Sequence, residues 1–202
     1  MPDQPPRLSP LAGMLVPGDY GLATRDGAGV LIEERLGLSI VQVATRRGQA
    51  EAAASAIERS MGISPSSEAN SVAAGERASA VWIAPGQWLL IAEGMAEGEL
   101  SRLLCEAARE VAATMDQSHA RCVLRIAGPQ AGALLAKGCP LDLDPRTFPA
   151  GTCAQSMVGP VAALLHRLDE TLLFDLYLPR SYAVSVWEWL TESAAEFGFR
   201  VS

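Results

Sequence analysis

Three segments of this chain share one spacing of apolar residues, and that spacing decides which packed layers the chain can form. In each segment, apolar residues recur at positions i, i+3, i+4, i+7 and i+11, which places them along one face of a helix. The three stripes are Ala50, Ala53, Ala54, Ile57 and Met61; Leu100, Leu103, Leu104, Ala107 and Val111; and Ala183, Val186, Trp187, Leu190 and Ala194. Each predicted helix must therefore bury one face against another element.

Strand patterns separate these helices, and their order repeats along the chain. We predict strands at residues 38–45, 79–84, 87–92, 120–126, 161–168, 171–178 and 198–201, with a hairpin at Pro85 and Gly86. Residues 38–118 give strand, helix, strand, strand, helix, strand, and residues 119–202 give this order again. A βαββαβ unit is the ferredoxin-like arrangement, with helices on one face of an antiparallel sheet. The sequence therefore predicts an α+β fold of two tandem ferredoxin-like units.

The expected domains are an extended N-terminal arm at residues 1–29, a first unit at 30–118 and a second unit at 119–202. Residues 1–29 hold five of the 13 prolines and five of the 18 glycines. Such an arm is either disordered in a monomer or laid along a neighbouring chain in an assembly. We expect Pro10 and Leu11 to be candidate interface residues.

One strand, turn and helix can be predicted in detail. In RCVLRIA at residues 121–127, Cys122, Leu124 and Ile126 alternate with the other residues, as in a strand with one apolar face. Pro129 suits the first turn of the following helix. Gly138 is placed to end that helix in a left-handed conformation.

Several segments together resemble a known family. They are MDQSH at residues 115–119, RCVLRIA at 121–127, KGCPLDL at 137–143, FPAGTC at 148–153, FDLYLPRSY at 174–182 and WEW at 187–189. In order and spacing the chain resembles the gamma subunit of heterotetrameric sarcosine oxidase, most clearly in its C-terminal half. More widely, it is similar in fold to the first two parts of the folate-binding T-protein of glycine cleavage.

The resemblance implies a function carried by a complex. The four-subunit enzyme would oxidatively demethylate sarcosine to glycine, with hydrogen peroxide and either formaldehyde or methylene-tetrahydrofolate as products. FAD, FMN, NAD, zinc and tetrahydrofolate are expected in partner subunits, which would be a large one, a flavin-containing one and a small zinc-containing one. The resemblance assigns the gamma subunit no cofactor and no catalytic role.

The residues themselves point to no catalytic, cofactor or metal site. Asp116, Ser118 and His119 are residue types of a hydrolase triad, but such close neighbours on an extended segment cannot converge as nucleophile and base. A serine at this position more often satisfies backbone groups. His166, inside an apolar run, more often has a structural role than that of a base.

Charge and apolar runs exclude further classes of function. The formal net charge is −7 and no basic stripe occurs, which argues against nucleic-acid binding. The N-terminus lacks the apolar core of a signal peptide, and no apolar run approaches 18 residues. We therefore expect a soluble, cytoplasmic protein that does not bind membranes.

The alternative function is a stand-alone folate-binding or aminomethyltransferase-like protein. In T-protein relatives a glycine-rich turn is followed by acidic residues that hold the pterin ring, and the counterpart here appears at residues 157–163. That segment has no carboxylate, although Asp142, Asp144 and Asp169 lie outside it. A third reading is a small-molecule sensing module, since ferredoxin-like pairs often bind effectors at strand edges.

The last helix offers a candidate interface residue, Trp189. Glu188, Glu192 and Glu196 repeat every four residues and predict a solvated stripe, and Trp189 lies between that stripe and the apolar face. Aromatic residues in such positions are enriched at protein interfaces. The competing interpretation is a tryptophan folded back over the edge of its own domain.

Overall fold

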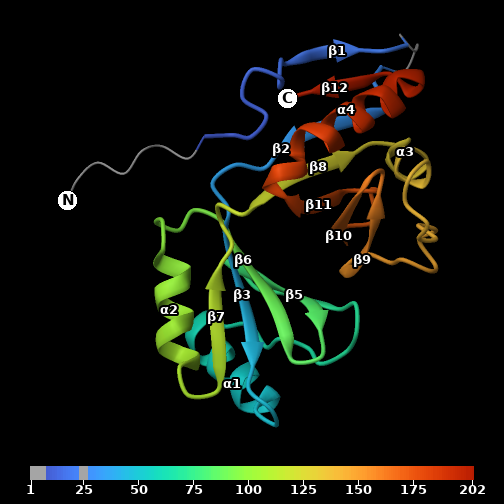
Figure 1. Ribbon diagram of the computed structural model, residues 1–202. Coiled ribbons are helices and arrows are strands. Elements are labelled where there is room, and N and C mark those ends of the chain that lie inside the picture. Colours follow the sequence, from blue (N-terminus) through green and yellow to red (C-terminus); the bar gives the residue numbers. More distant parts are fainter. Residues whose placement is uncertain (1–7, 23–26) are drawn as a thin grey trace.

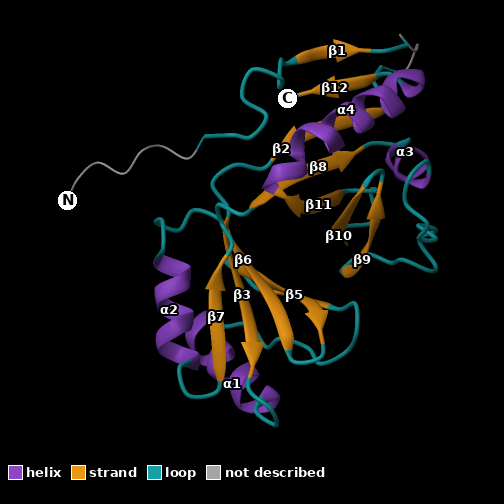
Figure 2. Ribbon diagram, viewed as in Figure 1, coloured by secondary structure: helices purple, strands orange, loops and turns teal. Residues whose placement is uncertain are grey.

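The computed structural model describes residues 8–22 and 27–202, which form two β-sheets with helices on their outer sides (Figures 1 and 2). The strands are β1 (Gly18–Tyr20), β2 (Val30–Glu34), β3 (Ser39–Thr45), β4 (Val72–Ala74), β5 (Ala78–Ala84), β6 (Gln87–Ala92), β7 (Ala112–Asp116), β8 (Arg121–Ala127), β9 (Thr152–Val158), β10 (Val161–Arg167), β11 (Phe174–Pro179) and β12 (Phe199–Val201). The α-helices are α1 (Ala50–Met61), α2 (Glu99–Ala108), α3 (Ala131–Ala136) and α4 (Ala183–Ala194), and short 3-10 helices cover Arg180–Tyr182 and Ala195–Phe197.

The smaller sheet has the predicted ferredoxin-like order. Its five strands run β4-β5-β6-β3-β7, so that β3, β5, β6 and β7 keep the spatial order 2-3-1-4 of such a unit, with β4 added at one edge. The apolar stripes of α1 and α2 pack on one face, where Ala53, Ile57, Leu100 and Leu104 are buried with strand residues such as Leu90. The predicted helices and hairpin of this half are confirmed.

The larger sheet is a ferredoxin-like unit with one strand inserted. Its order is β1-β12-β2-β8-β11-β10-β9, and β2 lies between β12 and β8, parallel to the first and antiparallel to the second. The sequence division assigned residues 30–34 to the first unit, whereas their hydrogen bonds place them in the sheet of the second. The reason is packing, because Val30 and Ile32 are fully buried in the core that also contains α4.

The two sheets pack face to face, which makes four layers of helices, sheet, sheet and helices. Side chains from both sheets form the core between them: Leu38, Ile40, Val81, Leu89, Ile91, Val123, Cys153, Leu164 and Tyr177. The opposite face of the larger sheet is covered by α3 and α4, and every residue of the predicted stripe on α4 is buried. As predicted, Cys122, Leu124 and Ile126 share one face of β8, toward these helices.

The described part of the N-terminal segment belongs to the chain's own fold. Leu11 has no exposed surface and packs in the core of the larger sheet. The Ser9 hydroxyl donates to Glu34 Oε2, and Arg180 Nη2 donates to the carbonyl of Leu8. The expectation that Leu11 meets a partner is therefore wrong, because its side chain fills a site within the chain. Residues 1–7 and 23–26 of the predicted arm lie outside the described residues.

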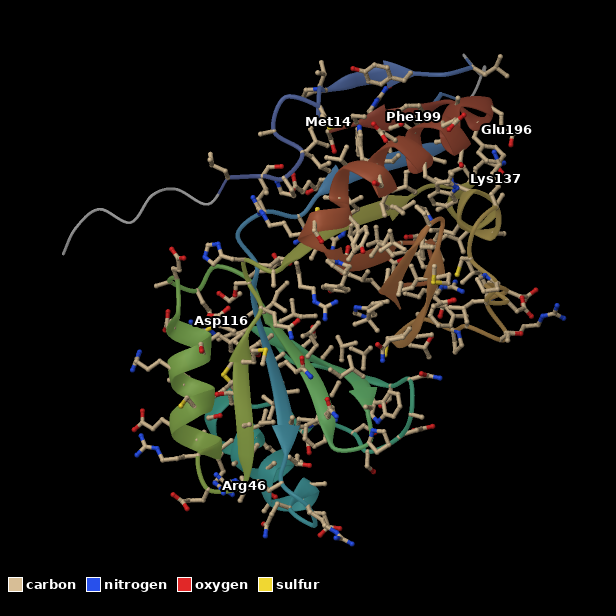
Figure 3. All side chains as sticks on the ribbon, in the orientation of Figure 1. Met14, Arg46, Asp116, Lys137, Glu196 and Phe199 are labelled. Carbon is tan, nitrogen blue, oxygen red and sulfur yellow. The ribbon has the colours of Figure 1, made fainter. Side chains whose placement is uncertain are left out.

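Gly138, just after α3, is required for a different reason from the predicted one. Its φ is not positive, so it does not end the helix in a left-handed conformation. Instead, a Cβ at Gly138 would lie 2.5 Å from the Trp189 ring and 2.9 Å from the Gly159 nitrogen. The neighbouring Lys137 pairs with Glu196 beyond α4 (Figure 3). The Nζ atom of Lys137 lies 4.6 Å from the centre of the Phe197 ring. Close contact between α3, α4 and the β9–β10 turn excludes a side chain at Gly138.

Gly132 and Gly138, which are six residues apart, should therefore respond oppositely to substitution by alanine. We expect Gly138→Ala to lower the free energy of unfolding by about 1–3 kcal/mol, since the added methyl group has no space. Gly132→Ala, inside α3 with nothing within 4 Å of the new Cβ, should raise it by up to about 1 kcal/mol. Urea denaturation measures both, and equal effects of the two substitutions would contradict this packing.

Candidate functional site

A cavity of about 370 Å³ lies between the two sheets and is the candidate functional site. The larger sheet contributes Arg125, His166, Asp175 and Tyr177 to its wall. Facing them are Leu38, the β4–β5 turn at residues 74–79, and Ile91 and Glu93 at the end of β6. The wall thus combines apolar surface with several ionisable groups.

Strand register assembles the polar wall. His166 on β10 lies opposite Asp175 on β11, Asp175 lies opposite Arg125 on β8, and Arg125 lies opposite Glu33 on β2. These four residues form one row across the face that looks toward the smaller sheet, because residues in register point the same way. Their chain neighbours Leu165, Leu176 and Leu124 point to the helical side, where they are buried.

The centre of the row is a buried ion pair. Arg125 donates to Asp175 through two bonds, Nε to Oδ1 at 2.7 Å and Nη2 to Oδ2 at 2.8 Å, and Asp175 is only 4% exposed. Burial alone would lower the pKa of Arg125, but its bonds and attraction to Asp175 outweigh this and raise the pKa. Arg125 is therefore charged in the folded protein, and it forms a two-bond ion pair with Asp175.

A second arginine extends the network. Arg35 pairs with Glu93, and its Nη1 lies 3.9 Å from Asp175 Oδ2 while its Nε lies 3.8 Å from Glu33 Oε1. Three carboxylates, Glu33, Glu93 and Asp175, thus meet two guanidinium groups, Arg35 and Arg125. This network carries one negative charge in excess.

His166 lies at the end of the row. It is 8% exposed, and its Nδ1 is buried with no hydrogen-bond partner among residues 8–22 and 27–202. Burial lowers the pKa of His166 to about 4; the Asp175 charge opposes this shift and the Arg125 charge adds to it. The imidazole is therefore neutral at pH 7, and it offers one donor and one acceptor.

This neutral histidine predicts a loss of stability in acid. Because the pKa of His166 is depressed from 6.5 to about 4, the unfolded chain takes up this proton before the folded chain does. Stability is thus lost as the pH falls from about 6.5 to about 4, by up to about 3 kcal/mol. His166→Leu should remove this component, so urea denaturation curves of the two proteins should diverge across this interval. Parallel pH dependences would contradict a buried neutral imidazole.

The predicted interface residues lie away from this cavity. Trp189 is half-buried, with its ring against Gly138 and Gly159, so it folds over the edge of its own domain. Pro10 is half-buried at the start of the described chain, beside the exposed Leu8 and Leu36. Leu11 is the fully buried residue described above. The structure does not bring these three residues into one site with the charged row.

Asp116, Ser118 and His119 form no triad, as predicted. The Ser118 amide donates to Asp116 Oδ1 at 2.8 Å, and the Ser118 hydroxyl exchanges hydrogen bonds with the backbone of Ile40. His119 points away and pairs with Glu97. These contacts fix the entry to β8 and leave the hydroxyl engaged with backbone groups.

The acids considered for folate lie elsewhere, and the acids that line the cavity were not anticipated. Asp144 pairs with Arg146, which lowers the pKa of Asp144 to about 2, and Asp169 accepts bonds from Thr171. Neither these two nor Asp142 lines the cavity, whose acids are Glu76, Glu93 and Asp175. A usable signal was present, since Arg125 interrupts the apolar run at residues 122–127 of β8 and Asp175 interrupts the apolar run of β11.

Among residues 8–22 and 27–202, no group of three or more histidine, cysteine, aspartate or glutamate side chains is arranged to hold a metal ion. No helix in this part of the chain is long and apolar enough to cross a membrane.

Residues 46–196 of this chain match the model of the sarcosine oxidase, gamma subunit family. A sarcosine oxidase subunit gamma from Arthrobacter sp is 28% identical over 179 residues, 87% of this chain and 86% of that protein. The subunit gamma from Corynebacterium sp. (strain P-1) is 32% identical over 123 residues, 60% of this chain. That match spans 59% of the length of the Corynebacterium protein.

Solved structures agree with this comparison. A chain of the heterotetrameric sarcosine oxidase from Corynebacterium sp. U-96, in complex with pyrrole 2-carboxylate, is similar with a TM-score of 0.82 and 25% identity, over 95% of this chain and 96% of that chain. The glycine cleavage system aminomethyltransferase T from Bartonella henselae gives 0.57 at 15% identity, over 84% of this chain and 50% of that one. The second likeness is one of fold, and it confirms the predicted relation to the T-protein fold.

Proposed function

The chain belongs to the sarcosine oxidase gamma subunit family, and from this premise we propose that it is a non-catalytic subunit of a heterotetrameric sarcosine oxidase. The observation that carries the proposal is the structural similarity to a chain of such an enzyme, with a TM-score of 0.82 over 95% of this chain. A subunit that takes the same place in such an assembly must have a similar fold along its whole length.

The proposed complex oxidatively demethylates sarcosine to glycine and forms hydrogen peroxide, with the one-carbon unit leaving as formaldehyde or methylene-tetrahydrofolate. Its chemistry belongs to partner subunits, a large one, a flavin-containing one and a small zinc-containing one, which together bind FAD, FMN, NAD, zinc and tetrahydrofolate. The complex acts in the cytoplasm. Consistent with a structural role, Arg125 and Asp175, and Arg35 and Glu93, pair with one another at this chain's inter-sheet cavity rather than surround a nucleophile.

Trp189 and Pro10 remain the proposed contacts with partner subunits. Pro10 lies beside Leu8 and Leu36, which are 70% and 61% exposed, so two exposed leucines accompany it at the surface. Burial of exposed leucines against a partner would favour association. Trp189 offers the part of its ring that Gly138 and Gly159 leave uncovered.

Omission of this chain tests the proposal. Co-expression of the complete set of subunits should yield a stable complex, whereas the set without this chain should yield less of it. The purified chain alone should produce no hydrogen peroxide from sarcosine. Sarcosine-dependent peroxide from the isolated chain, or full assembly in its absence, would contradict a non-catalytic structural subunit.

A stand-alone folate-binding or aminomethyltransferase-like protein is not favoured. The likeness to aminomethyltransferase T covers half of that enzyme and is one of fold. Saturable binding of tetrahydrofolate by the isolated chain would be the result that favours it.

A further inference from the structure

The wall of the cavity between the sheets includes a histidine with a nitrogen that lacks a hydrogen bond, and the proposed subunit role does not account for it. His166 lines this cavity, is 92% buried, and keeps Nδ1 without a partner among the described residues. A buried polar atom without a hydrogen bond is unfavourable, and a native structure retains one where a ligand or water completes it. The cavity therefore has the character of a small-molecule site.

The charges of the cavity wall select the kind of ligand. The wall contains three acids, Glu76, Glu93 and Asp175, and two arginines, Arg77 and Arg125. The adjoining Glu33 and Arg35 add one charge of each sign, so the excess remains one negative charge. An anion would meet this excess unfavourably, whereas a cation would neutralise it.

The carboxylates also keep acceptor positions for a ligand. Each ionised carboxylate accepts about four hydrogen bonds. Asp175 has accepted two from Arg125, and Glu93 is paired through one oxygen, Oε1. The side chains of Leu38, Ile91 and Tyr177 supply apolar surface beside these acceptors.

We propose that this cavity binds a small molecule that carries a protonated amino group. The ammonium group lies among the carboxylates of Asp175 and Glu93 and donates a hydrogen bond to the neutral imidazole of His166. The apolar part of the molecule lies against Leu38, Ile91 and Tyr177. This site concerns the chain itself and does not depend on its proposed partners.

Three probes of similar size and different charge test the proposal on the full chain. Titration with n-butylammonium at pH 7.5, followed by calorimetry or NMR, should give saturable binding with a Kd on the order of 1 mM, as expected for a ligand of so few atoms. Butyrate and n-butanol should bind at least about tenfold more weakly. Equal binding of the three probes, or no binding of n-butylammonium, would overturn the proposal.

Substitutions locate the site. His166→Leu should weaken n-butylammonium binding about tenfold or more. The matched control is His119→Leu, which removes the chain's other histidine, outside this cavity, and should leave binding unchanged. Glu93→Gln, at a side chain that is 66% exposed, tests the charge contribution without a large packing change and should also weaken binding. Binding that survives both His166→Leu and Glu93→Gln would place the probe elsewhere and refute the assignment.

Discussion

Asp175→Ala is expected to lower the free energy of unfolding by about 3–5 kcal/mol, the largest single effect that the structure predicts. Asp175 is 4% exposed and accepts two hydrogen bonds from Arg125, while Arg35 Nη1 lies 3.9 Å away. Its removal leaves two guanidinium groups near a space that has lost its central negative charge. Urea denaturation followed by circular dichroism measures the loss.

The matched control is Asp19→Ala. Asp19 forms the same bidentate contact with Arg200, through bonds of 2.6 and 3.0 Å, but both side chains are more than half exposed. Solvent screens such a pair, so this substitution should leave the denaturation midpoint almost unchanged. The double substitution Arg125→Met with Asp175→Leu should cost less than Asp175→Ala alone, since it leaves no unpaired charge. A small effect of Asp175→Ala would mean that the pair is solvated.

Leu11→Ala is expected to cost about 2–5 kcal/mol, as for a leucine removed from a packed core. Leu11 has no exposed surface and belongs to the core between the larger sheet and α4. Thermal and urea denaturation of the full chain measure the effect. Leu11 lies in the segment that the sequence predicted to be an extended N-terminal arm.

Leu8→Ala is the control for Leu11→Ala. Leu8 lies three residues earlier and is 70% exposed, so its truncation should change stability by no more than about 0.5 kcal/mol. Equal and small effects of the two substitutions would mean that the segment around Leu11 leaves the fold freely. That result would restore Leu11 as a candidate contact for a partner.

The elements that the sequence predicted correctly are those whose pattern of apolar residues is complete within a short stretch of the chain. The stripe of Ala183, Val186, Trp187, Leu190 and Ala194 predicted α4 because helix periodicity is local, and all five residues are buried. The alternation in residues 121–127 predicted β8 and its buried face for the same reason.

The parts that sequence did not predict depend on distant pairing. The segment Val30–Glu34 lies between β12 and β8, which are about 170 and about 90 residues away along the chain, and no local pattern encodes those partners. The role of Gly138 depends on Trp189, which is 51 residues away. The composition of residues 1–29 predicted an extended arm and could not indicate which core Leu11 fills.

The cavity was hidden for a related reason. His166, Asp175, Arg125 and Glu33 come from four strands and become neighbours only through register. Sequence could identify each as a polar residue in or beside an apolar strand, but not the row that they form. The carboxylate that accompanies His166 is Asp175, nine residues later, across a hairpin.

Isolation of the chain with its natural partners tests the central claim most directly. The tagged chain is purified gently from its native host, and co-purifying polypeptides are identified by intact mass spectrometry. A subunit of a heterotetrameric sarcosine oxidase should bring down three further polypeptides of different size together with bound flavin. Recovery of the chain alone, without flavin, would contradict the account.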